Sequence, residues 1–287
     1  MSNSKGNTDA KSEYILGHSE REIARLKAQA AELDPITRRF LCEAGIVPGM
    51  RVLDVGSGAG DVAFLAAKLV GATGEVVGVD LAPAAVEVAR SRATSHSLEN
   101  VAFLEGNPAA MSFDRPFDAV IGRYVLQFQK DPVAMLRAVT AHVRPKGLIV
   151  FQENDWAGLA SFPPVPTFDQ VCQWASTTMR RHGTETHMGA KLHGTFVGAG
   201  LESPTMRLEA PVGGTPANLT WLKRFKELIA TLLPEMERLG VATAGQVDIE
   251  TLVERISDEA ARTSSVIIGH FYVGAWARRQ SRQPMAP

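Results

Sequence analysis

Apolar residues gather in short runs through the first half of the chain, and the stretches between these runs are amphipathic. The apolar runs predict strands near 51–55, 75–79, 101–105, 117–122 and 147–153. The amphipathic stretches predict helices near 60–70, 83–93 and 132–143. Strands that are joined by helical crossovers form a parallel sheet with helices on both faces, so we predict a doubly wound α/β fold. In such a sheet a ligand binds beyond the carboxyl ends of the strands.

The second half of the chain is less regular. Helices are expected at 168–181 and at about 191–199, and strands at 205–212 and 265–277. Between the two strands, the stretches 218–239 and 247–261 are amphipathic and flank a break that contains glycine. We therefore predict a helical insertion at 213–262, which forms either a lid over the site or a plain packing layer.

The N-terminal part predicts a tail followed by helices. Residues 1–12 are polar, so a disordered tail is expected. Ser19 and Glu22 form a capping-box pattern, which predicts a helix from Glu20 to about 33, and a second helix ends near Gly45. We accordingly expect a single domain at 13–287, with N-terminal helices at 13–46 and a cofactor-binding core at 47–155.

Composition and charge indicate which kinds of binding partner and cellular location to expect. The 287-residue chain has a formal net charge of −1, with Lys and Arg scattered among acids, so a nucleic-acid partner is disfavoured. The sequence shows no apolar run of membrane-spanning length and no hydrophobic signal segment, so a cytoplasmic protein without a membrane span is expected. Cys42 and Cys172 lie far apart and predict neither a disulfide framework nor a metal site. The oligomeric state is left open, a homodimer included.

A glycine-rich turn follows the first predicted strand. Gly56, Gly58 and Gly60 have the spacing G-x-G-x-G, which differs from the G-x-G-x-x-G of dinucleotide binders. Glycine allows the backbone to bend sharply and to touch a ligand without an intervening Cβ atom. The turn leads into a helix, whose N-terminus offers backbone N–H groups to that ligand.

An acid ends the second predicted strand. Asp80 stands twenty positions after Gly60, where a carboxylate accepts hydrogen bonds from both ribose hydroxyls of an adenosine-bearing cofactor. Taken alone, the glycines could belong to an ordinary turn, and Asp80 could be a solvated acid at a strand end. Together, in a strand-turn-helix-strand context, they predict a nucleoside-containing cofactor.

Further motifs follow in order, and with them the chain resembles the class I S-adenosylmethionine-dependent methyltransferases of the small-molecule type. The stretches that carry this resemblance are Glu105-Gly106-Asn107-Pro108, Phe117-Asp118-Ala119-Val120-Ile121, Asp131-Pro132 and Pro145-Lys146-Gly147-Leu148-Ile149-Val150. The opening Tyr14-Ile15-Leu16-Gly17 is similar to the N-terminal helices of that family. Two departures concern loop shape: a short stretch between Asn107 and Phe117, and Lys146 in place of the first glycine of a Gly-Gly turn.

The resemblance implies a fold and a set of residues that bind the cofactor. The fold is a Rossmann-like, mostly parallel seven-stranded sheet with N-terminal helices and an inserted helical lid. Backbone contacts to the methionine and ribose parts are expected from the glycine turn, and Asp54 favours the positive ammonium and sulfonium groups. Arg123 meets the methionine carboxylate or supports the loop. The full set is Tyr14, Asp54, Gly56, Ser57, Gly58, Gly60, Asp80, Leu81, Gly106, Asn107, Pro108 and Arg123.

Candidate catalytic bases lie at the exit of the fifth predicted strand. Glu153 and Asp155 are the acids there, and each is either a general base or a cap for a neighbouring loop. His182, His187 and His193 lie close in sequence, but their spacing matches no zinc motif, so no metal is expected. The sequence offers no acid–histidine pair at motif spacing. Positioning of the methyl group is therefore favoured over base catalysis.

These observations together predict an enzyme that moves a methyl group from S-adenosyl-L-methionine to a small, largely apolar metabolite, at oxygen or carbon, by in-line transfer. One alternative is an NAD-dependent oxidoreductase, which the glycine spacing and the lack of a Tyr-x-x-x-Lys motif disfavour. Another is an S-adenosylmethionine-binding module that does not methylate.

Overall fold

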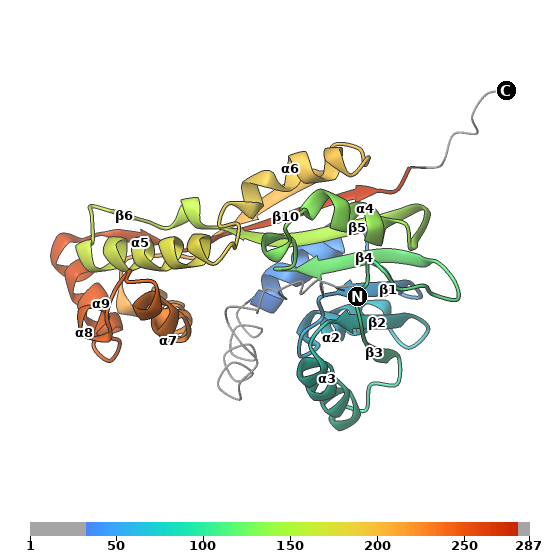
Figure 1. Cartoon of the computed structure of the whole chain (residues 1–287), viewed down its shortest axis with the longest axis horizontal. Helices are drawn as coiled ribbons and strands as arrows, with labels where there is room; N and C mark the ends of the chain where they lie inside the picture. The colour runs from blue at the N-terminus through green and yellow to red at the C-terminus, as the bar shows by residue number, and fades with distance from the viewer. Residues whose placement is uncertain (1–32, 281–287) are drawn as a thin grey trace, which may run out of the picture.

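Seven strands form the central sheet of the computed structural model, which describes residues 33–280 (Figure 1). The strands are β1 (Arg51–Val55), β2 (Glu75–Asp80), β3 (Val101–Glu105), β4 (Phe117–Arg123), β5 (Val143–Asp155), β7 (Thr205–Glu209) and β10 (Phe271–Arg278). Their order in the sheet is β3-β2-β1-β4-β5-β10-β7. The first five are parallel to one another, and β10 is antiparallel to both of its neighbours. The predicted seven-stranded, mostly parallel sheet is confirmed.

Helices cover both faces of this sheet. One face packs against the helix at 33–44, α2 (Asp61–Val70) and α3 (Pro83–Ser95), and the other against α4 (Pro132–Thr140) and α6 (Met188–Gly198). Side chains alternate between the two faces along a strand, so Val150 lies in the first core and Phe151 in the second. All five residues of β1 are buried, as expected for a parallel strand that is covered on both sides.

A second lobe begins directly after β5. It contains α5 (Pro166–Arg181), α7 (Leu222–Arg238), α8 (Ala244–Val247), α9 (Leu252–Thr263) and a small sheet in the order β6 (Ala160–Phe162), β9 (Val266–Ile268), β8 (Val212–Gly213). Trp156, Phe168, Phe225 and Ile256 share a core in this lobe that is separate from the two cores of the main sheet. Figure 1 shows the lobe on the left, with α5 running alongside β6.

The structure adds elements that the sequence pattern did not predict. The expected strands at 205–212 and 265–277 each divide into two strands, which belong to two different sheets. The breaks lie at Pro211 and Gly269, where the Gly269 N–H donates to the Pro211 carbonyl oxygen (2.9 Å). Proline has no N–H to continue a strand ladder, which explains the first break. The expected helices of the insertion correspond to α7 and α9, and α5 packs against both.

Two features of the loops agree with the sequence. Gly45 follows the helix at 33–44 with a φ of 99°, which is the left-handed conformation that commonly ends a helix. Lys146 has a φ of 63°, so it adopts the conformation of the glycine that it replaces. The disordered tail expected at 1–12 and almost all of the helix expected from Glu20 to about 33 lie outside the described part of the chain, so these predictions stay untested.

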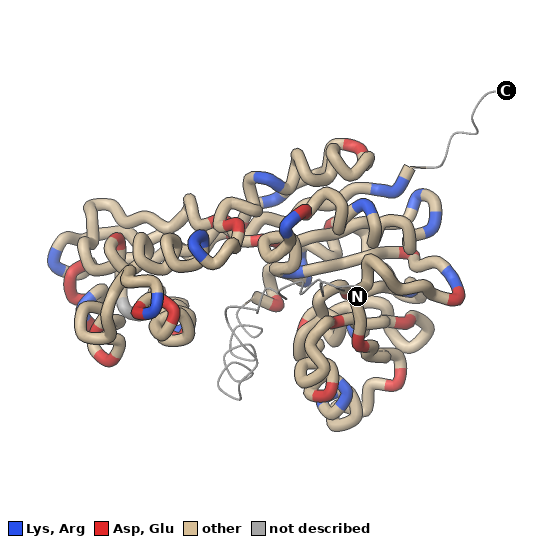
Figure 2. The backbone as a smooth tube through the Cα atoms, viewed as in Figure 1, with Lys and Arg blue, Asp and Glu red and all other residues tan. Residues whose placement is uncertain are grey.

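Residues with positive and negative charge are interspersed along the backbone of both lobes (Figure 2). No helix within residues 33–280 is both long enough and apolar enough to cross a membrane.

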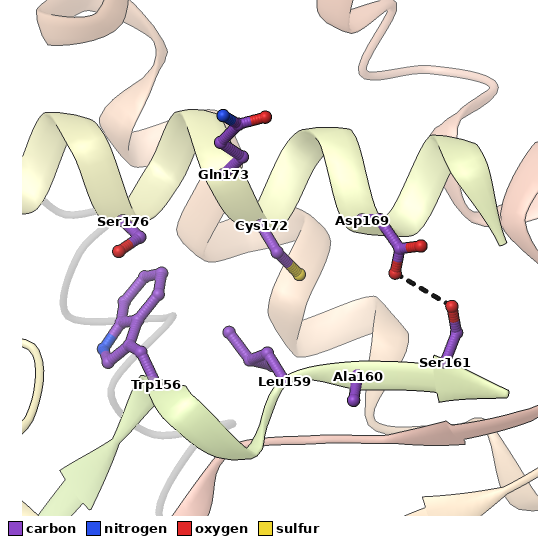
Figure 3. Close-up of a pocket in the computed structure, with 8 residues that line it drawn as sticks. All are labelled: Trp156, Leu159, Ala160, Ser161, Asp169, Cys172, Gln173 and Ser176. Atoms are coloured by element: carbon purple, nitrogen blue, oxygen red, sulfur yellow. Dashed lines mark hydrogen bonds between the residues drawn. The ribbon is translucent and has the colours of Figure 1, made fainter. Parts of the chain in front are cut away.

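The second lobe contains a cavity of about 410 Å³ between α5 and the segment that leads into β6 (Figure 3). Trp156, Leu159 and Cys172 line it, and on its polar side the Ser161 hydroxyl donates to Asp169 Oδ1 (2.8 Å). Neither this cavity nor one of about 770 Å³ beside α2 and β3 is lined by the glycine turn.

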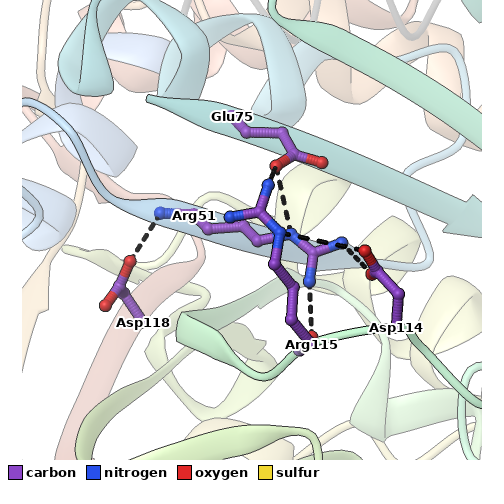
Figure 4. A network of polar contacts seen from close by, with 5 residues as sticks. All are labelled: Arg51, Glu75, Asp114, Arg115 and Asp118. Atoms are coloured by element: carbon purple, nitrogen blue, oxygen red, sulfur yellow. Dashed lines mark hydrogen bonds and ion pairs between the residues drawn. The ribbon is translucent and has the colours of Figure 1, made fainter. Parts of the chain in front are cut away.

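A network of charged side chains links the amino ends of β1, β2 and β4 (Figure 4). Arg51 is 8% exposed; its Nε lies 3.1 Å from Glu75 Oε2 and its Nη2 lies 2.9 Å from Asp114 Oδ1. The backbone N–H of Arg51 donates to Asp118 Oδ2 (2.7 Å). Because the network lies at the amino edge, it is remote from the carboxyl ends of the strands, where the site residues gather.

Candidate functional site

The glycine turn lies between β1 and α2 at the carboxyl edge of the sheet. Gly56 and Gly58 have φ values of 65° and 53°, a region that side chains other than glycine rarely adopt. A Cβ atom on Gly56 would lie 2.8 Å from Val125 Cγ2, so the turn fits closely against the loop that follows β4. A Cβ atom on Gly58 would meet nothing within 4 Å. Gly58 therefore faces open space, where a ligand can approach the backbone.

Asp80 ties the glycine turn to the neighbouring strand. Its Oδ2 accepts a hydrogen bond from the Gly58 N–H (2.8 Å), and its Oδ1 accepts one from the Ala82 N–H (2.9 Å). An ionised carboxylate has about four acceptor positions, so these two bonds leave capacity for hydroxyl groups. Asp80 is thus placed both to shape the turn and to accept bonds from a ribose.

Exposed groups follow β2 and β3 at the same edge. Leu81 is 68% exposed, which is unusual for a large apolar side chain and provides a surface for a flat ring. The Gly106 N–H donates to the Asp80 carbonyl oxygen (2.9 Å), and Asn107 is exposed while its Oδ1 accepts from the Ala109 N–H (3.0 Å). Pro108 is buried, and its carbonyl oxygen lies 2.8 Å from His142 Nε2, so it anchors the loop.

Two buried polar atoms beside the turn have no hydrogen-bond partner among the described residues. They are Asp54 Oδ2 and Ser57 Oγ. Burial raises the pKa of Asp54 to about 8, and the nearby Arg123 guanidinium opposes this rise. An unpaired buried carboxyl is costly, and a cation or a donor group next to it would relieve that cost. The turn therefore fits a ligand that carries positive charge.

Arg123 ends β4 and points toward the helix at 33–44. Its Nη1 donates to Thr37 Oγ1 (3.0 Å) and lies 3.4 Å from Asp34 Oδ1. The helix thus holds the guanidinium, and contact with a methionine carboxylate stays a prediction. Gly60 caps the start of α2 in the left-handed conformation, as a turn residue. Tyr14 lies outside the described residues, so its predicted role stays untested.

Glu153 is fully buried beneath the loop that follows β4. Its Oε1 accepts hydrogen bonds from the N–H groups of Val125 (2.9 Å) and Leu126 (2.8 Å), and its Oε2 has no partner among the described residues. Burial raises the pKa of this carboxyl to about 8, and the backbone bonds oppose the rise. These contacts are those of a group that holds a loop in place.

Asp155 lies on the sheet face that α6 covers. Its Oδ2 accepts from the Ala190 N–H (2.8 Å), and its Oδ1 accepts from the Ala157 N–H (2.9 Å) and lies 3.1 Å from His187 Nδ1. Gln152, on the opposite face, instead accepts a hydrogen bond from Thr37 of the helix at 33–44 (2.8 Å). The sequence showed no acid–histidine pair at motif spacing, but the fold brings together Asp155 and His187, which lie 32 positions apart.

Three residues near the carboxyl edge of the sheet were not singled out by the sequence analysis: Tyr124, Arg224 and Tyr272. Tyr124 has a φ of 60°, a strained conformation for an aromatic residue that costs about 1–3 kcal/mol and is typical of functional positions. Arg224 of α7 donates to the hydroxyl of Tyr272 of β10, and its guanidinium lies 5.9 Å from the centre of that ring. Only the place of Tyr124 directly after Arg123 could have indicated it, because the other two meet through tertiary folding alone.

The geometry of the turn agrees with the result of a comparison with protein families. A family profile described as "Methyltransferase domain" matches residues 46–217, which is more than half of the chain. The chain belongs to the class I S-adenosylmethionine-dependent methyltransferases. The matched segment runs from just before β1 to the short loop region between β8 and α7.

Similar proteins include methyltransferases with named substrates. Aklanonic acid methyltransferase DauC of Streptomyces sp. (strain C5) is 37% identical over 133 residues, which are 46% of this chain and 60% of that protein. The demethylmenaquinone methyltransferase of Staphylococcus aureus (strain MRSA252) is 32% identical over 135 residues, 47% of this chain and 53% of that protein. The match therefore spans between 53% and 60% of the length of these curated relatives.

Solved structures share the fold of this methyltransferase. The YcgJ protein of Bacillus subtilis has a TM-score of 0.52 at 18% identity, covering 85% of this chain and 98% of that one. The [4+2]-cyclase SpnF has a TM-score of 0.52 at 18% identity, covering 86% of this chain and 81% of that one. At this identity the likeness concerns the fold alone.

S-adenosyl-L-methionine is the methyl donor of this family, and the described residues fit it. Gly58 leaves open space beside the turn, Asp80 retains acceptor capacity for ribose hydroxyls, and Leu81 offers an apolar surface for adenine. Asp54 Oδ2, which has no partner among the described residues, suits the positive charge of the donor, because a nearby cation favours the ionised form of a carboxyl. Within residues 33–280, no three His, Cys, Asp or Glu side chains gather as a metal site.

Proposed function

We propose that this protein transfers a methyl group from S-adenosyl-L-methionine to a small, largely apolar metabolite, at an oxygen or carbon atom. The observation that carries the proposal is the bond between Asp80 and Gly58, in a turn that leaves open space and lies beside the buried Asp54 carboxyl. This arrangement offers acceptors for ribose hydroxyls and a carboxyl whose ionised form a nearby cation would favour, and it does so in a chain of the methyltransferase family.

The donor supplies a methyl group on a sulfonium sulfur, which is already a good leaving group. The task of the protein is then to hold the donor and the acceptor in line and to exclude water. The glycine turn and Asp80 hold the donor, and Glu153 fixes the loop at 125–126, in which Val125 lies against Gly56 of the turn. We propose that Glu153 and Asp155 act by positioning, since backbone amides occupy both carboxyls.

The acceptor is proposed to be a small molecule. The names of the two relatives give aklanonic acid and demethylmenaquinone as their substrates, which supports this class. The net charge of −1 and the interspersed charges of Figure 2 give no support for a polyanionic acceptor such as RNA.

We propose that the second lobe covers the acceptor. Trp156 joins the core of this lobe and directly follows the carboxyl end of β5, and α7 contacts β10 through Arg224 and Tyr272. The lobe therefore adjoins the edge where the site residues gather. A lid at this edge would shield the reacting groups from water.

Titration calorimetry with the full chain tests the cofactor. We expect S-adenosylmethionine and S-adenosylhomocysteine to bind, and NAD not to bind. Binding of NAD without binding of S-adenosylmethionine would replace the proposal by the oxidoreductase alternative.

A second candidate function is a module that binds the cofactor without methylating. The [4+2]-cyclase SpnF has this fold, and its name gives a reaction other than methyl transfer. Tight binding of S-adenosylmethionine without release of S-adenosylhomocysteine, across a broad panel of small metabolites, would favour that candidate.

A further inference from the structure

The side chain of Arg92, in α3, reaches the glycine turn that follows β1. Its Nη1 donates to the carbonyl oxygen of Ala59 (2.5 Å), and its Nη2 donates to Asp61 Oδ1 (2.7 Å). Ala59 lies inside the turn, and Asp61 is the first residue of α2. One guanidinium therefore joins the last part of the turn to the helix that follows it, from 33 and 31 positions away in sequence.

The guanidinium is held in a partly buried setting. The side chains of Arg92 and Asp61 are 19% and 10% exposed, so water and salt screen their ion pair less than a pair on the surface. The Arg92 Cζ atom lies 5.0 Å from the centre of the Phe64 ring, and Phe64 lies edge-on to Phe103. A planar guanidinium that lies over a ring and pairs with a carboxylate is restricted in its orientation. Arg92 can therefore hold the Ala59 carbonyl in one direction.

The bond to Ala59 also determines the position of Gly60. A peptide group is planar, so the directions of the Ala59 carbonyl and the Gly60 N–H are linked. Arg92 binds the carbonyl, and the Gly60 N–H donates to the Ser57 carbonyl oxygen (2.9 Å). Gly60 has a φ of 92°, and a Cβ atom there would lie 2.8 Å from a ring atom of Phe64. This peptide is thus held on both sides, in a conformation that suits glycine.

Asp80 and Arg92 hold the turn at neighbouring residues. Asp80 accepts from the Gly58 N–H, and Arg92 donates to the carbonyl of the next residue, Ala59. Gly58 is also the residue beside which a ligand has open space. Side chains of the protein therefore set the shape of the turn, so that little of the binding free energy of a ligand goes into ordering this loop.

We propose that Arg92 is a positioning residue for methyl transfer, which holds the glycine turn through Ala59 in the shape that binds the methyl donor. It acts through the turn, because both of its hydrogen bonds end on protein groups. Its loss should therefore weaken binding of the donor and leave the chemical step unchanged once the donor is bound. This inference rests on the proposed function, because it assigns a role in binding the donor of that reaction.

Titration calorimetry with S-adenosylhomocysteine and the full chain tests the role of Arg92. Arg92→Ala should weaken binding about tenfold to a hundredfold, as for the loss of a charged hydrogen bond. Arg92→Lys should weaken binding by less, about threefold to tenfold, because an ammonium group lacks the planar fork that reaches two acceptors. Arg92→Lys keeps the positive charge, so it tests the proposal even where Arg92→Ala fails to fold.

Kinetics separate positioning of the donor from a general loss of active protein. With an acceptor that the wild type methylates, Arg92→Lys should raise the KM for S-adenosylmethionine and keep kcat within about threefold at saturating donor. A variant that is merely less well folded would lose kcat in proportion to its folded fraction and keep the KM.

Arg90→Ala is the matched control. Arg90 lies on the same helix, and its Nε and Nη2 donate to the Phe103 carbonyl oxygen (3.1 and 2.9 Å), which belongs to β3 and not to the turn. The control also removes a guanidinium from a backbone carbonyl, and it should keep the donor affinity of the wild type.

Asp61→Asn separates the bond to the turn from the ion pair with α2. Asparagine keeps an acceptor oxygen for Arg92 and removes the negative charge, while the bond to Ala59 remains. This variant should lose less than about threefold in donor affinity. A loss as large as that of Arg92→Ala would show that the ion pair, and not the bond to the turn, determines donor binding.

Three results would overturn the proposal: wild-type affinity in both Arg92 variants, equal losses in Arg90→Ala and Arg92→Ala, or an equally large loss in Asp61→Asn. Failure of the proposed function has a different signature. The wild type would then either not bind S-adenosylhomocysteine, or bind the donor and transfer no methyl group.

Discussion

The Asp80 carboxylate accepts a hydrogen bond from the Gly58 N–H at 2.8 Å, which joins the acid that ends β2 to the glycine turn after β1. The same carboxylate also accepts from Ala82, at the start of α3. An acid that was expected only to contact ribose is therefore also a structural part of the turn. Its replacement acts on the cofactor in two ways, by removing an acceptor and by loosening the loop.

Asp80→Ala should weaken binding of S-adenosylmethionine by about 1.5–3 kcal/mol, the range for hydrogen bonds to a charged acceptor. Asp80→Asn should be milder, because one acceptor oxygen remains. Calorimetry measures both. Asp114→Asn is the control, since it removes an acid at the amino edge of the sheet (Figure 4), and it should leave the affinity unchanged. Wild-type affinity in Asp80→Ala would remove this residue from the site.

Gly58→Ala should weaken cofactor binding, because the new Cβ atom enters the space beside the turn. The substitution also strains a backbone with a φ of 53°, so a loss of stability of about 1 kcal/mol is expected. Gly240→Ala carries similar strain, at a φ of 63° and with no atom near its Cβ, but it follows α7 in the second lobe. It should lose similar stability and keep the cofactor affinity. If both variants keep wild-type affinity, no ligand approaches Gly58.

Glu153→Gln should change how the stability of the protein depends on pH. The pKa of Glu153 is raised to about 8 in the folded protein. The contribution of its protonated carboxyl to the free energy of unfolding is therefore fully present below the pKa that Glu153 has in the unfolded chain, and it is lost as pH rises through 8. Glutamine keeps the acceptor for the loop amides and has no proton to lose. Between pH 5 and pH 9 the wild type should therefore lose more unfolding free energy than the variant, on the order of 2 kcal/mol. Denaturant titrations at the two pH values measure this difference, and equal losses would show that Glu153 is ionised in the fold.

Turnover separates positioning from base catalysis. If the two acids only hold loops, Glu153→Gln and Asp155→Asn should stay within about tenfold of wild type, which corresponds to about 1.4 kcal/mol. A general base would cost about 10²–10⁴ in rate. A loss beyond a hundredfold at unchanged cofactor affinity would assign a base, and His187→Gln would then show whether the Asp155–His187 pair supplies it.

The second lobe should respond to the acceptor. If α7 and α9 cover the acceptor, their amide hydrogen exchange should slow when S-adenosylhomocysteine and a small-molecule acceptor are added together. Deletion of this segment is a poor test, because Phe225 and Ile256 share a core with Phe168 of α5. The C-terminal end of α3 serves as an internal reference whose exchange should not change. Equal exchange in α7 with and without ligands would make the lobe a packing layer.

The parts of the fold with strong local patterns could be predicted from the sequence. Strand β1 was placed at its observed bounds because Val52, Leu53 and Val55 are buried on both faces of the sheet and a glycine turn follows at once. The small sheet was missed because β8 has two residues and β6 and β9 have three, too few for a periodic pattern to show.

The residues discussed for the site also divide into those that a local sequence pattern predicts and those that only the fold brings together. The glycine turn and Asp80 have a spacing along the chain that reflects one local supersecondary unit, so the sequence alone indicated them. Arg224 and Tyr272 lie 48 positions apart and meet only through packing of the lobe on the sheet. Tyr124 has a positive φ that its identity does not suggest, because the conformation is imposed by Gln152, Glu153 and the turn around it.

Transfer of a labelled methyl group tests the central claim most directly. The full chain would be incubated with S-adenosylmethionine that carries a tritiated methyl group and with a panel of ring-bearing acids, enols and phenols, followed by extraction of the organic products. The account predicts label in at least one extracted product, together with an equal amount of S-adenosylhomocysteine, and a weaker signal for Gly58→Ala at limiting cofactor. Tight binding of S-adenosylmethionine with no label in any product across the panel would contradict it.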